Sequence, residues 1–178
     1  MQNKKGSIVA IEPSTGEILS LVSSPYYDPN LLIGRSRSPN FNRMYKDENK
    51  PLFDRSLLAE YPPGSTFKLL NALIALEEDV ISPLTSFSCD EGWRFSAKLK
   101  IGCHAHRTPL NLTESITQSC NAYYCNTFRR IIEKYPTAAE GYENWRNHIL
   151  SFGLGNFLGN DLYTCLLYTS PSPRDVEE

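Results

Sequence analysis

The first regular pattern along the chain is a pair of short apolar segments, Ser7–Glu12 and Glu17–Ser23, rich in β-branched residues. The turn-forming sequence Pro-Ser-Thr-Gly separates them. This pattern predicts a β-hairpin. Residues 25–50 are polar and rich in Pro, Asn, Arg and Ser. They are expected to form a long loop that can hold short helical pieces.

Helical periodicity dominates the rest of the chain. Apolar residues at helical spacing predict a helix over residues 65–78, and they are Leu69, Leu70, Leu73, Ile74 and Leu76. A second helix is expected from a cap at Asn111 or Thr113 to about Tyr135, and a third over Ala138–Phe152. Short β-like pieces lie between residues 81 and 109. A hairpin followed by mostly helical segments predicts an α+β fold.

Composition limits the classes of protein that fit. The chain has 178 residues, 40% of them hydrophobic, and a formal net charge of −2. This size suits one domain or part of a larger one, and the charge gives no indication of nucleic-acid binding. No stretch approaches about 20 apolar residues, so no membrane span is expected. The first residues lack the apolar core of a signal peptide.

The end of the chain breaks the preceding pattern. Cys165–Asp175 reads CLLYTSPSPRD, and one permitted coding sequence for it resembles the transposase adapter used in short-read sequencing. We therefore expect residues 164–178 to be a disordered sequencing artefact and residues 1–163 to be a partial domain. The alternative is a natural tail rich in Ser and Pro.

A candidate nucleophile lies where the first predicted helix begins. Pro62, Pro63 and Gly64 favour a rigid turn, and Ser65 and Lys68 follow it at a spacing that places them on one helical face. A serine beside a lysine of lowered pKa is one way to activate a hydroxyl, and the helix N-terminus offers an N–H donor to an oxyanion. The motif alone is weak, because a capping serine and a solvent-exposed lysine give the same letters.

A second constellation, Ser119-Cys120-Asn121, follows about fifty residues later. A Ser and an Asn separated by one residue can project a hydroxyl and an amide toward a common point from a helix junction. The structural alternative is a helix cap or a buried polar pair.

Longer segments around both motifs carry a family resemblance. YPPGSTFK and QSCNAYY, preceded by GSIVAIEPSTGEILSLVSSPYYDPN, resemble class B penicillin-binding proteins, in particular the penicillin-binding protein 2 group of elongation D,D-transpeptidases. PLFDRSLLAEYPPGS and SFGLGNFLGNDL add to the similarity, which runs from about Gly6 to about Leu162. The resemblance implies the penicillin-recognising serine transpeptidase/β-lactamase-like fold, an antiparallel sheet flanked by helices.

The resemblance also implies roles. Ser65 is expected to attack the D-Ala–D-Ala bond of a peptidoglycan stem peptide, with Lys68 as general base. Ser119 is expected to relay protons and Asn121 to hold the substrate amide, and β-lactams are expected to acylate the same serine. The implied partners are stem peptides, β-lactams and a membrane glycosyltransferase of the elongation machinery. The implied location is the bacterial inner membrane, facing the periplasm.

One family motif is absent from this sequence. The family has a Lys-Ser/Thr-Gly strand lining its active site, whereas the only lysine after Asn121 is Lys134, followed by Tyr135 and Pro136. The 178-residue chain by itself is therefore expected to be catalytically incompetent. Three rival functions remain open: a serine β-lactamase, a non-catalytic β-lactam sensor and an inactive structural relative.

Cysteine and histidine residues suggest a metal site. The chain has five cysteines, an odd number that argues against a pure disulfide framework. Zn²⁺ in structural sites favours four S and N ligands, and the candidates are Cys89, Cys103, His106 and Cys120, with His104 as the alternate histidine and Asp90 as a replacement for Cys89. Their long spacings do not match a zinc-finger signature. Some members of the penicillin-binding protein 2 group carry zinc beside the SxN motif, and Cys120 fits that place.

Three structural alternatives compete with the metal. A Cys89–Cys103 disulfide suits an oxidising compartment, the histidines can be surface or core residues, and Cys120 can be a small apolar side chain. No cofactor is expected for the chemistry itself. Large aromatic residues are expected in the core rather than in the site, and they are Phe53, Tyr123, Tyr124, Phe128, Trp145 and Phe152.

Overall fold

The structure is a computed structural model that describes residues 4–96 and 98–156. The chain divides into two compact units, and within the described residues the first ends at Tyr61 and the second begins at Pro62. The sequencing artefact expected at residues 164–178 lies outside the described residues. No helix in the described part of the chain is long and apolar enough to cross a membrane.

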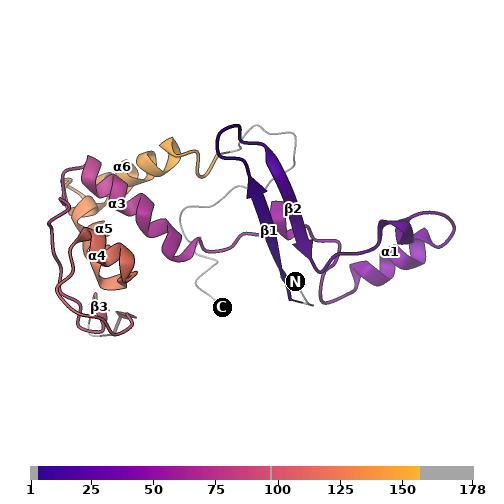
Figure 1. The fold of residues 1–178 in the computed structure, drawn as a ribbon, viewed down its shortest axis with the longest axis horizontal. Coiled ribbons are helices and arrows are strands. Elements are labelled where there is room, and N and C mark those ends of the chain that lie inside the picture. Colours follow the sequence, from indigo (N-terminus) through magenta and orange to yellow (C-terminus); the bar gives the residue numbers. More distant parts are fainter. Residues whose placement is uncertain (1–3, 97, 157–178) are drawn as a thin grey trace. The chain divides into compact units, whose positions relative to one another are not determined.

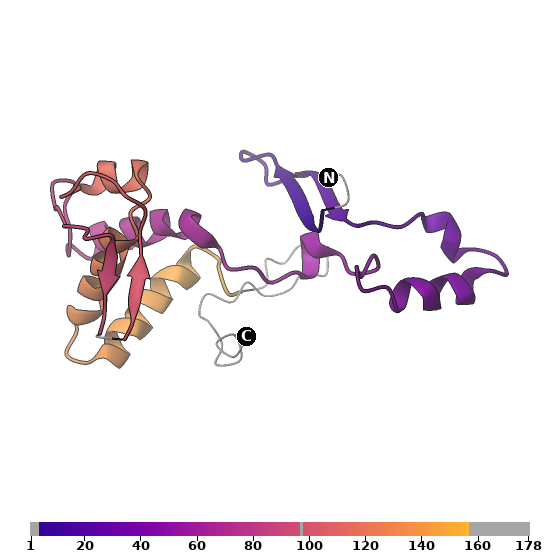
Figure 2. The same ribbon diagram turned by 90° about the horizontal axis from the view of Figure 1, so that it is seen from below.

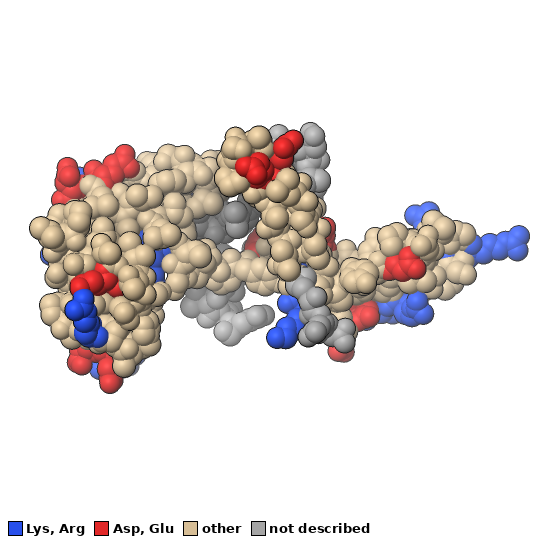
Figure 3. All heavy atoms as spheres, in the orientation of Figure 1, with Lys and Arg blue, Asp and Glu red and all other residues tan. Residues whose placement is uncertain are grey.

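Unit 1 contains the predicted hairpin. Strand β1 (Gly6–Ile11) pairs with β2 (Ile18–Ser24) in antiparallel register, with Ile8 opposite Val22, which confirms the hairpin (Figure 1). A 3-10 turn η1 (Pro29–Leu32), helix α1 (Arg37–Tyr45) and the short helix α2 (Arg55–Leu58) follow. The helical pieces allowed for in residues 25–50 are therefore η1 and the nine-residue α1. Lys and Arg side chains gather around the α1 segment (Figure 3).

Unit 1 buries few side chains. Among its described residues, Ser24, Met44 and Arg55 are buried. The Arg55 guanidinium donates to the carbonyl oxygens of Asn49 and Lys50 at 2.8 and 3.2 Å. A buried guanidinium needs hydrogen-bond acceptors. These two bonds therefore hold the loop before α2 in place.

Unit 2 is mostly helical. After the 3-10 turn η2 (Gly64–Thr66) come α3 (Phe67–Glu77), the antiparallel pair β3 (Gly92–Arg94) and β4 (Lys100–Gly102), and the helices α4 (Leu112–Thr117), α5 (Asn121–Glu133) and α6 (Ala138–Ser151). Figure 2 shows the β3–β4 pair, which confirms the short β pieces expected between residues 81 and 109. The helices predicted at 65–78 and 138–152 are confirmed within a few residues.

The helix predicted from about residue 111 to 135 is wrong as a single helix. Asn111 caps α4 through a capping box with Glu114, as its residue type suggested. The helix then stops at Gln118, because Ser119 has a positive φ of 48°, which an α-helix cannot accommodate. Cys120 then caps a new helix, α5. This break lies inside the SxN motif.

The core of unit 2 lies between α3, α5 and α6. Ile74, Ile131 and Ile149 are fully buried in it, and the Trp145 indole donates to Asn71 Oδ1 at 2.8 Å. The core prediction is confirmed for Tyr123, Tyr124 and Trp145, and Phe128 packs against the same cluster. It is wrong for Phe53 and Phe152, which are 36% and 45% exposed.

A buried carboxylate connects the ends of α3 and α5 to α6. Glu78, at the end of α3, is 8% exposed and accepts hydrogen bonds from Lys134, Tyr135, Asn144 and His148 at 2.6–2.8 Å. Burial raises the pKa of Glu78, but these hydrogen bonds outweigh burial and lower it to about 2. Glu78 therefore stays ionised and holds α3, α5 and α6 together.

Candidate active site

The Pro-Pro-Gly turn sets the position of the candidate nucleophile. Gly64 has a φ of 62°, a left-handed conformation that glycine adopts without a steric penalty. Thr66 Oγ1 donates to Pro63 O at 2.7 Å. Ser65 thus lies in the 3-10 turn η2, immediately before α3 rather than inside it. Its side chain is exposed, as a nucleophile must be to meet a substrate.

Lys68 connects the two sequence motifs. Its Nζ donates to Ser119 O at 2.6 Å, to Ser119 Oγ at 3.0 Å and to Asn121 Oδ1 at 2.6 Å. An ammonium has three N–H donors, so these acceptors use all of them. Residues more than fifty positions apart in sequence therefore meet at one point. The described residues give Ser65 Oγ no hydrogen bond to Lys68, so the expected serine–lysine pair is not formed in this conformation.

The break between α4 and α5 places both SxN residues. The left-handed backbone at Ser119 turns its carbonyl and hydroxyl toward Lys68, and Asn121 begins α5 one residue after the cap. Asn121 Nδ2 also donates to Gly102 O at 2.8 Å, so the amide is held from both sides. Uncommon backbone conformations of this kind are often found at functional sites.

The electrostatic environment of Lys68 suits a general base. Burial lowers the pKa of Lys68 because it penalises the charged form. The thiols of Cys103, Cys120 and Cys125 act in the opposite direction and do not cancel it. A lysine that loses its proton more readily than usual suits the role of general base.

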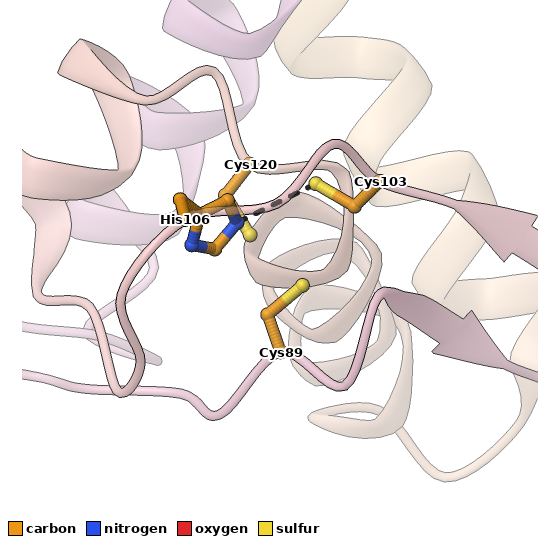
Figure 4. Close-up of side chains that lie close together, drawn as sticks. All are labelled: Cys89, Cys103, His106 and Cys120. Carbon is orange, nitrogen blue, oxygen red and sulfur yellow. Dashed lines mark hydrogen bonds between the residues drawn. The ribbon is translucent and has the colours of Figure 1, made fainter.

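The predicted metal ligands converge beside this site. Figure 4 shows Cys89, Cys103, His106 and Cys120 facing one another, and their ligand atoms all lie within 4.8 Å of one another. Cys89 precedes β3, Cys103 follows β4 and Cys120 caps α5, so three separate segments contribute. His104 and Asp90, the sequence alternatives, are not in the group of four. The four described cysteines are free thiols, and the alternative Cys89–Cys103 disulfide is not formed.

The donor set and its surroundings fit Zn²⁺. Three thiols and one imidazole form a Cys₃His set. His106 Nδ1 lies 2.7 Å from Arg107 O, so this nitrogen carries the proton and Nε2, 3.5 Å from Cys103 Sγ, is free to bind a metal. Backbone N–H groups of Asn121 and Tyr123 donate to Cys103 and Cys120 at 3.3 and 3.4 Å. Such bonds favour thiolates.

The thiols differ in their environments. Burial raises the pKa of Cys103, but hydrogen bonds, chiefly the one from the Asn121 N–H, outweigh burial and bring it to about 7. Burial raises the pKa of Cys120 to about 12. A bound cation would stabilise both as thiolates.

Sequence reasoning missed two parts of this arrangement. The Gly102 carbonyl that holds Asn121 is a backbone group and leaves no signal in the sequence. The aromatic ring beside Lys68, that of Tyr124, was assigned to the core alone. Its position three residues after Asn121 on a helix was the available signal.

The geometry agrees with the comparisons with known proteins. A family model described as the penicillin-binding protein transpeptidase domain matches residues 6–164. The chain belongs to this family of serine enzymes, and its α+β elements are those of the family's fold.

Two similar proteins are both peptidoglycan D,D-transpeptidases. The chain is 30% identical over 167 residues to the peptidoglycan D,D-transpeptidase MrdA of Acinetobacter baumannii, covering 91% of this chain and 23% of that protein. It is 48% identical over 75 residues to PbpA of Mycobacterium tuberculosis, covering 40% of this chain and 15% of that protein. The chain spans about a quarter of the length of MrdA.

Solved structures of penicillin-binding proteins also resemble this chain. Pseudomonas aeruginosa PBP2 in complex with WCK 5153 superposes with a TM-score of 0.80 at 26% identity, covering 97% of this chain and 38% of that one. The imipenem acyl-enzyme complex of penicillin-binding protein A from M. tuberculosis superposes with a TM-score of 0.72 at 30% identity, covering 85% and 35% of the two chains.

Proposed function

We propose that the chain is part of a peptidoglycan D,D-transpeptidase of the cell envelope that cross-links stem peptides during elongation. The observation that supports this function most directly is the contact of Lys68 Nζ with Ser119 and Asn121 beside the exposed Ser65. The names of the relatives favour a transpeptidase over a β-lactamase or a sensor. By the same resemblance, a membrane glycosyltransferase is its partner, and the enzyme faces the periplasm from the inner membrane.

In the proposed reaction, Ser65 Oγ attacks the carbonyl carbon of the D-Ala–D-Ala bond. Lys68, once neutral, takes the hydroxyl proton, and Ser119 relays a proton to the amine of the leaving D-Ala. An ester links Ser65 to the stem peptide until an amine of a neighbouring stem peptide attacks it. Asn121 Nδ2 exchanges its bond to Gly102 for the substrate amide. A β-lactam acylates Ser65 in the same way, and the ring nitrogen is the leaving group.

Acylation by a fluorescent penicillin tests this function. In a protein extended to include a Lys-Ser/Thr-Gly strand, we expect saturable labelling that Ser65→Ala abolishes and Lys68→Ala reduces by about 10²–10⁴-fold. Ser14→Ala, an exposed serine in the turn of unit 1, is the matched control and should label normally. Labelling that survives Ser65→Ala would refute the assignment. The 178-residue chain alone should not be labelled, and saturable acylation of its Ser65 would show that the third motif is dispensable.

We also propose that Cys89, Cys103, His106 and Cys120 hold a structural Zn²⁺. When bound, the metal supplies a fixed cross-link between the segments before β3, after β4 and at the start of α5. Cys120 lies between Ser119 and Asn121, so this cross-link braces the SxN residues without touching substrate.

Cobalt substitution tests the metal site. Co²⁺ bound by three thiolates should give visible charge-transfer and ligand-field bands and a stoichiometry of about one metal per chain. Cys103→Ser should remove the bands, whereas Cys125→Ser, which changes the other described cysteine, should keep them. Purified protein without zinc and with a Cys89–Cys103 disulfide in its peptide map would rule the site out.

A further inference from the structure

The Lys68 ammonium has an aromatic neighbour besides its three oxygen acceptors. Its Nζ lies over the ring of Tyr124, 5.8 Å from the ring centroid, within the range of a cation–π interaction. Asn121 and Tyr124 are three residues apart on α5 and share one face of it. This face of α5 therefore offers an amide oxygen and an aromatic ring to the same ammonium.

The hydroxyl group does not explain why a tyrosine occupies this position. Tyr124 is 6% exposed, and its hydroxyl is buried without a hydrogen-bond partner among the described residues. The Ser115 hydroxyl donates to Leu112 O at 2.7 Å, and its interaction with the Tyr124 hydroxyl offsets only part of the effect of burial, which raises the pKa of Tyr124. An unpaired buried hydroxyl costs stability, and the contact with Lys68 is made by the ring.

The preceding residue provides a contrast. Tyr123 is fully buried, donates its hydroxyl to Thr85 O at 3.1 Å and packs edge-to-face on Phe87 with ring centroids 4.9 Å apart. None of these contacts involves Lys68. Two adjacent tyrosines of one helix thus face different surroundings, and only the second of the pair meets Lys68.

We propose that Tyr124 is a positioning residue for acylation of Ser65. The face of its ring holds the Lys68 ammonium against Ser119 and Asn121, and its hydroxyl contributes nothing to this role. A lysine side chain has four rotatable bonds and loses much conformational freedom when it is fixed. The ring closes one side of the ammonium to water and to other rotamers. The effect on acylation rests on the proposed function, whereas the Lys68–Tyr124 contact does not.

Nuclear magnetic resonance of the full 178-residue chain tests the contact directly. In the unmodified chain, the Tyr124 ring protons should give nuclear Overhauser effects to the Lys68 Hε protons, which should be shifted upfield by the ring current. Tyr124→Phe should keep the upfield shift and Tyr124→Leu should lose it. Tyr123→Phe, the matched control, should leave the Lys68 signals unchanged. Absence of the Overhauser effects in the unmodified chain overturns the proposal even if Tyr124→Leu does not fold.

Acylation kinetics test the consequence in a protein extended to include the third motif. Tyr124→Leu should lower the first-order acylation rate by about three- to tenfold and leave the dissociation constant of the non-covalent β-lactam complex unchanged. Tyr124→Phe should restore the full rate. The positioning role is overturned if Tyr124→Phe lowers the acylation rate as much as Tyr124→Leu does. It is also overturned if Tyr124→Leu weakens non-covalent binding and leaves the acylation rate unchanged. If Ser65 is never acylated, the proposed function fails, and the Overhauser effects still decide whether Tyr124 holds Lys68.

Discussion

In unit 1, most apolar side chains of β1 and β2 face solvent, with Ile8 54% and Leu19 65% exposed. In unit 2, Ile74 and Ile131 are fully buried between helices. Both units have regular secondary structure, but an isolated two-stranded hairpin is marginally stable in water. The difference shows that secondary structure in unit 1 follows local sequence, whereas unit 2 has a core that can hold a site in place. Every candidate catalytic and metal-binding residue lies in unit 2.

The two tryptophans offer a way to follow unit 2 alone. The chain contains Trp93 and Trp145, and both belong to unit 2. Trp93 donates to Asn126 on α5 at 3.1 Å, and Trp145 lies in the core of the helices. Unfolding measured by tryptophan fluorescence therefore reports on unit 2.

Metal removal should give the largest effect. If the four ligands hold zinc, chelation should lower the free energy of unfolding of unit 2 by about 4 kcal/mol relative to protein at free zinc a thousand times the dissociation constant. The hairpin amides of unit 1 should show unchanged hydrogen exchange. A fluorescence transition that does not move on chelation, in protein shown to contain zinc, would contradict a structural role for the metal.

Truncation of a core residue should come next. Ile74→Ala removes a fully buried side chain between α3 and its neighbours and should destabilise unit 2 by about 3 kcal/mol. The paired change Ile8→Ala, in the exposed hairpin, should leave the fluorescence transition where it was. Equal losses from both changes would show that the two units share one core.

The carboxylate of Glu78 gives a pH-dependent effect. Its folded pKa of about 2 lies below the ordinary value of 4.5. Its stabilising contribution, about 3 kcal/mol, is therefore complete above pH 4.5 and lost as the pH falls toward 2. Glu78→Gln should destabilise unit 2 near neutral pH, and the difference from the parent should shrink between pH 4.5 and 2. Glu140→Gln, which changes an exposed carboxylate in the first turn of α6, is the control. A difference that is independent of pH in denaturant titrations would argue against this assignment.

Of these four changes, a substitution at a close glycine contact should have the smallest effect on the stability of unit 2. A Cβ added at Gly141 on α6 would lie 2.3 Å from Ile132 O on α5. Gly141→Ala should therefore destabilise unit 2 by about 1–2 kcal/mol, although alanine favours a helix. At Gly102 an added Cβ meets nothing within 4 Å, and Gly102→Ala should change the midpoint of chemical unfolding little. A stabilised Gly141→Ala protein would mean that α5 and α6 can move apart at no cost.

Local patterns were sufficient for much of the secondary structure. The β1–β2 hairpin, α3 and α6 follow from alternation, helical periodicity and turn residues, which act over a few neighbouring positions. The single helix expected up to residue 135 failed at Ser119, because a left-handed serine carries no sequence signal. Phe53 and Phe152 were misplaced in the core, because hydrophobicity does not say which neighbours are available to cover a side chain.

The sequence by itself determined the chemistry that the chain can offer: a serine and a lysine three residues apart after a Pro-Pro-Gly turn, a Ser-Cys-Asn motif, and a set of cysteines and histidines. Only the tertiary structure decided which of these groups meet. Packing of α3 against α5 brings Lys68 to Ser119 and Asn121, and the β3–β4 pair carries Cys103 to Cys120. The physical reason is that hydrogen bonding and metal binding act over a few ångströms, and distances of that size between residues far apart in sequence are set by the packed core.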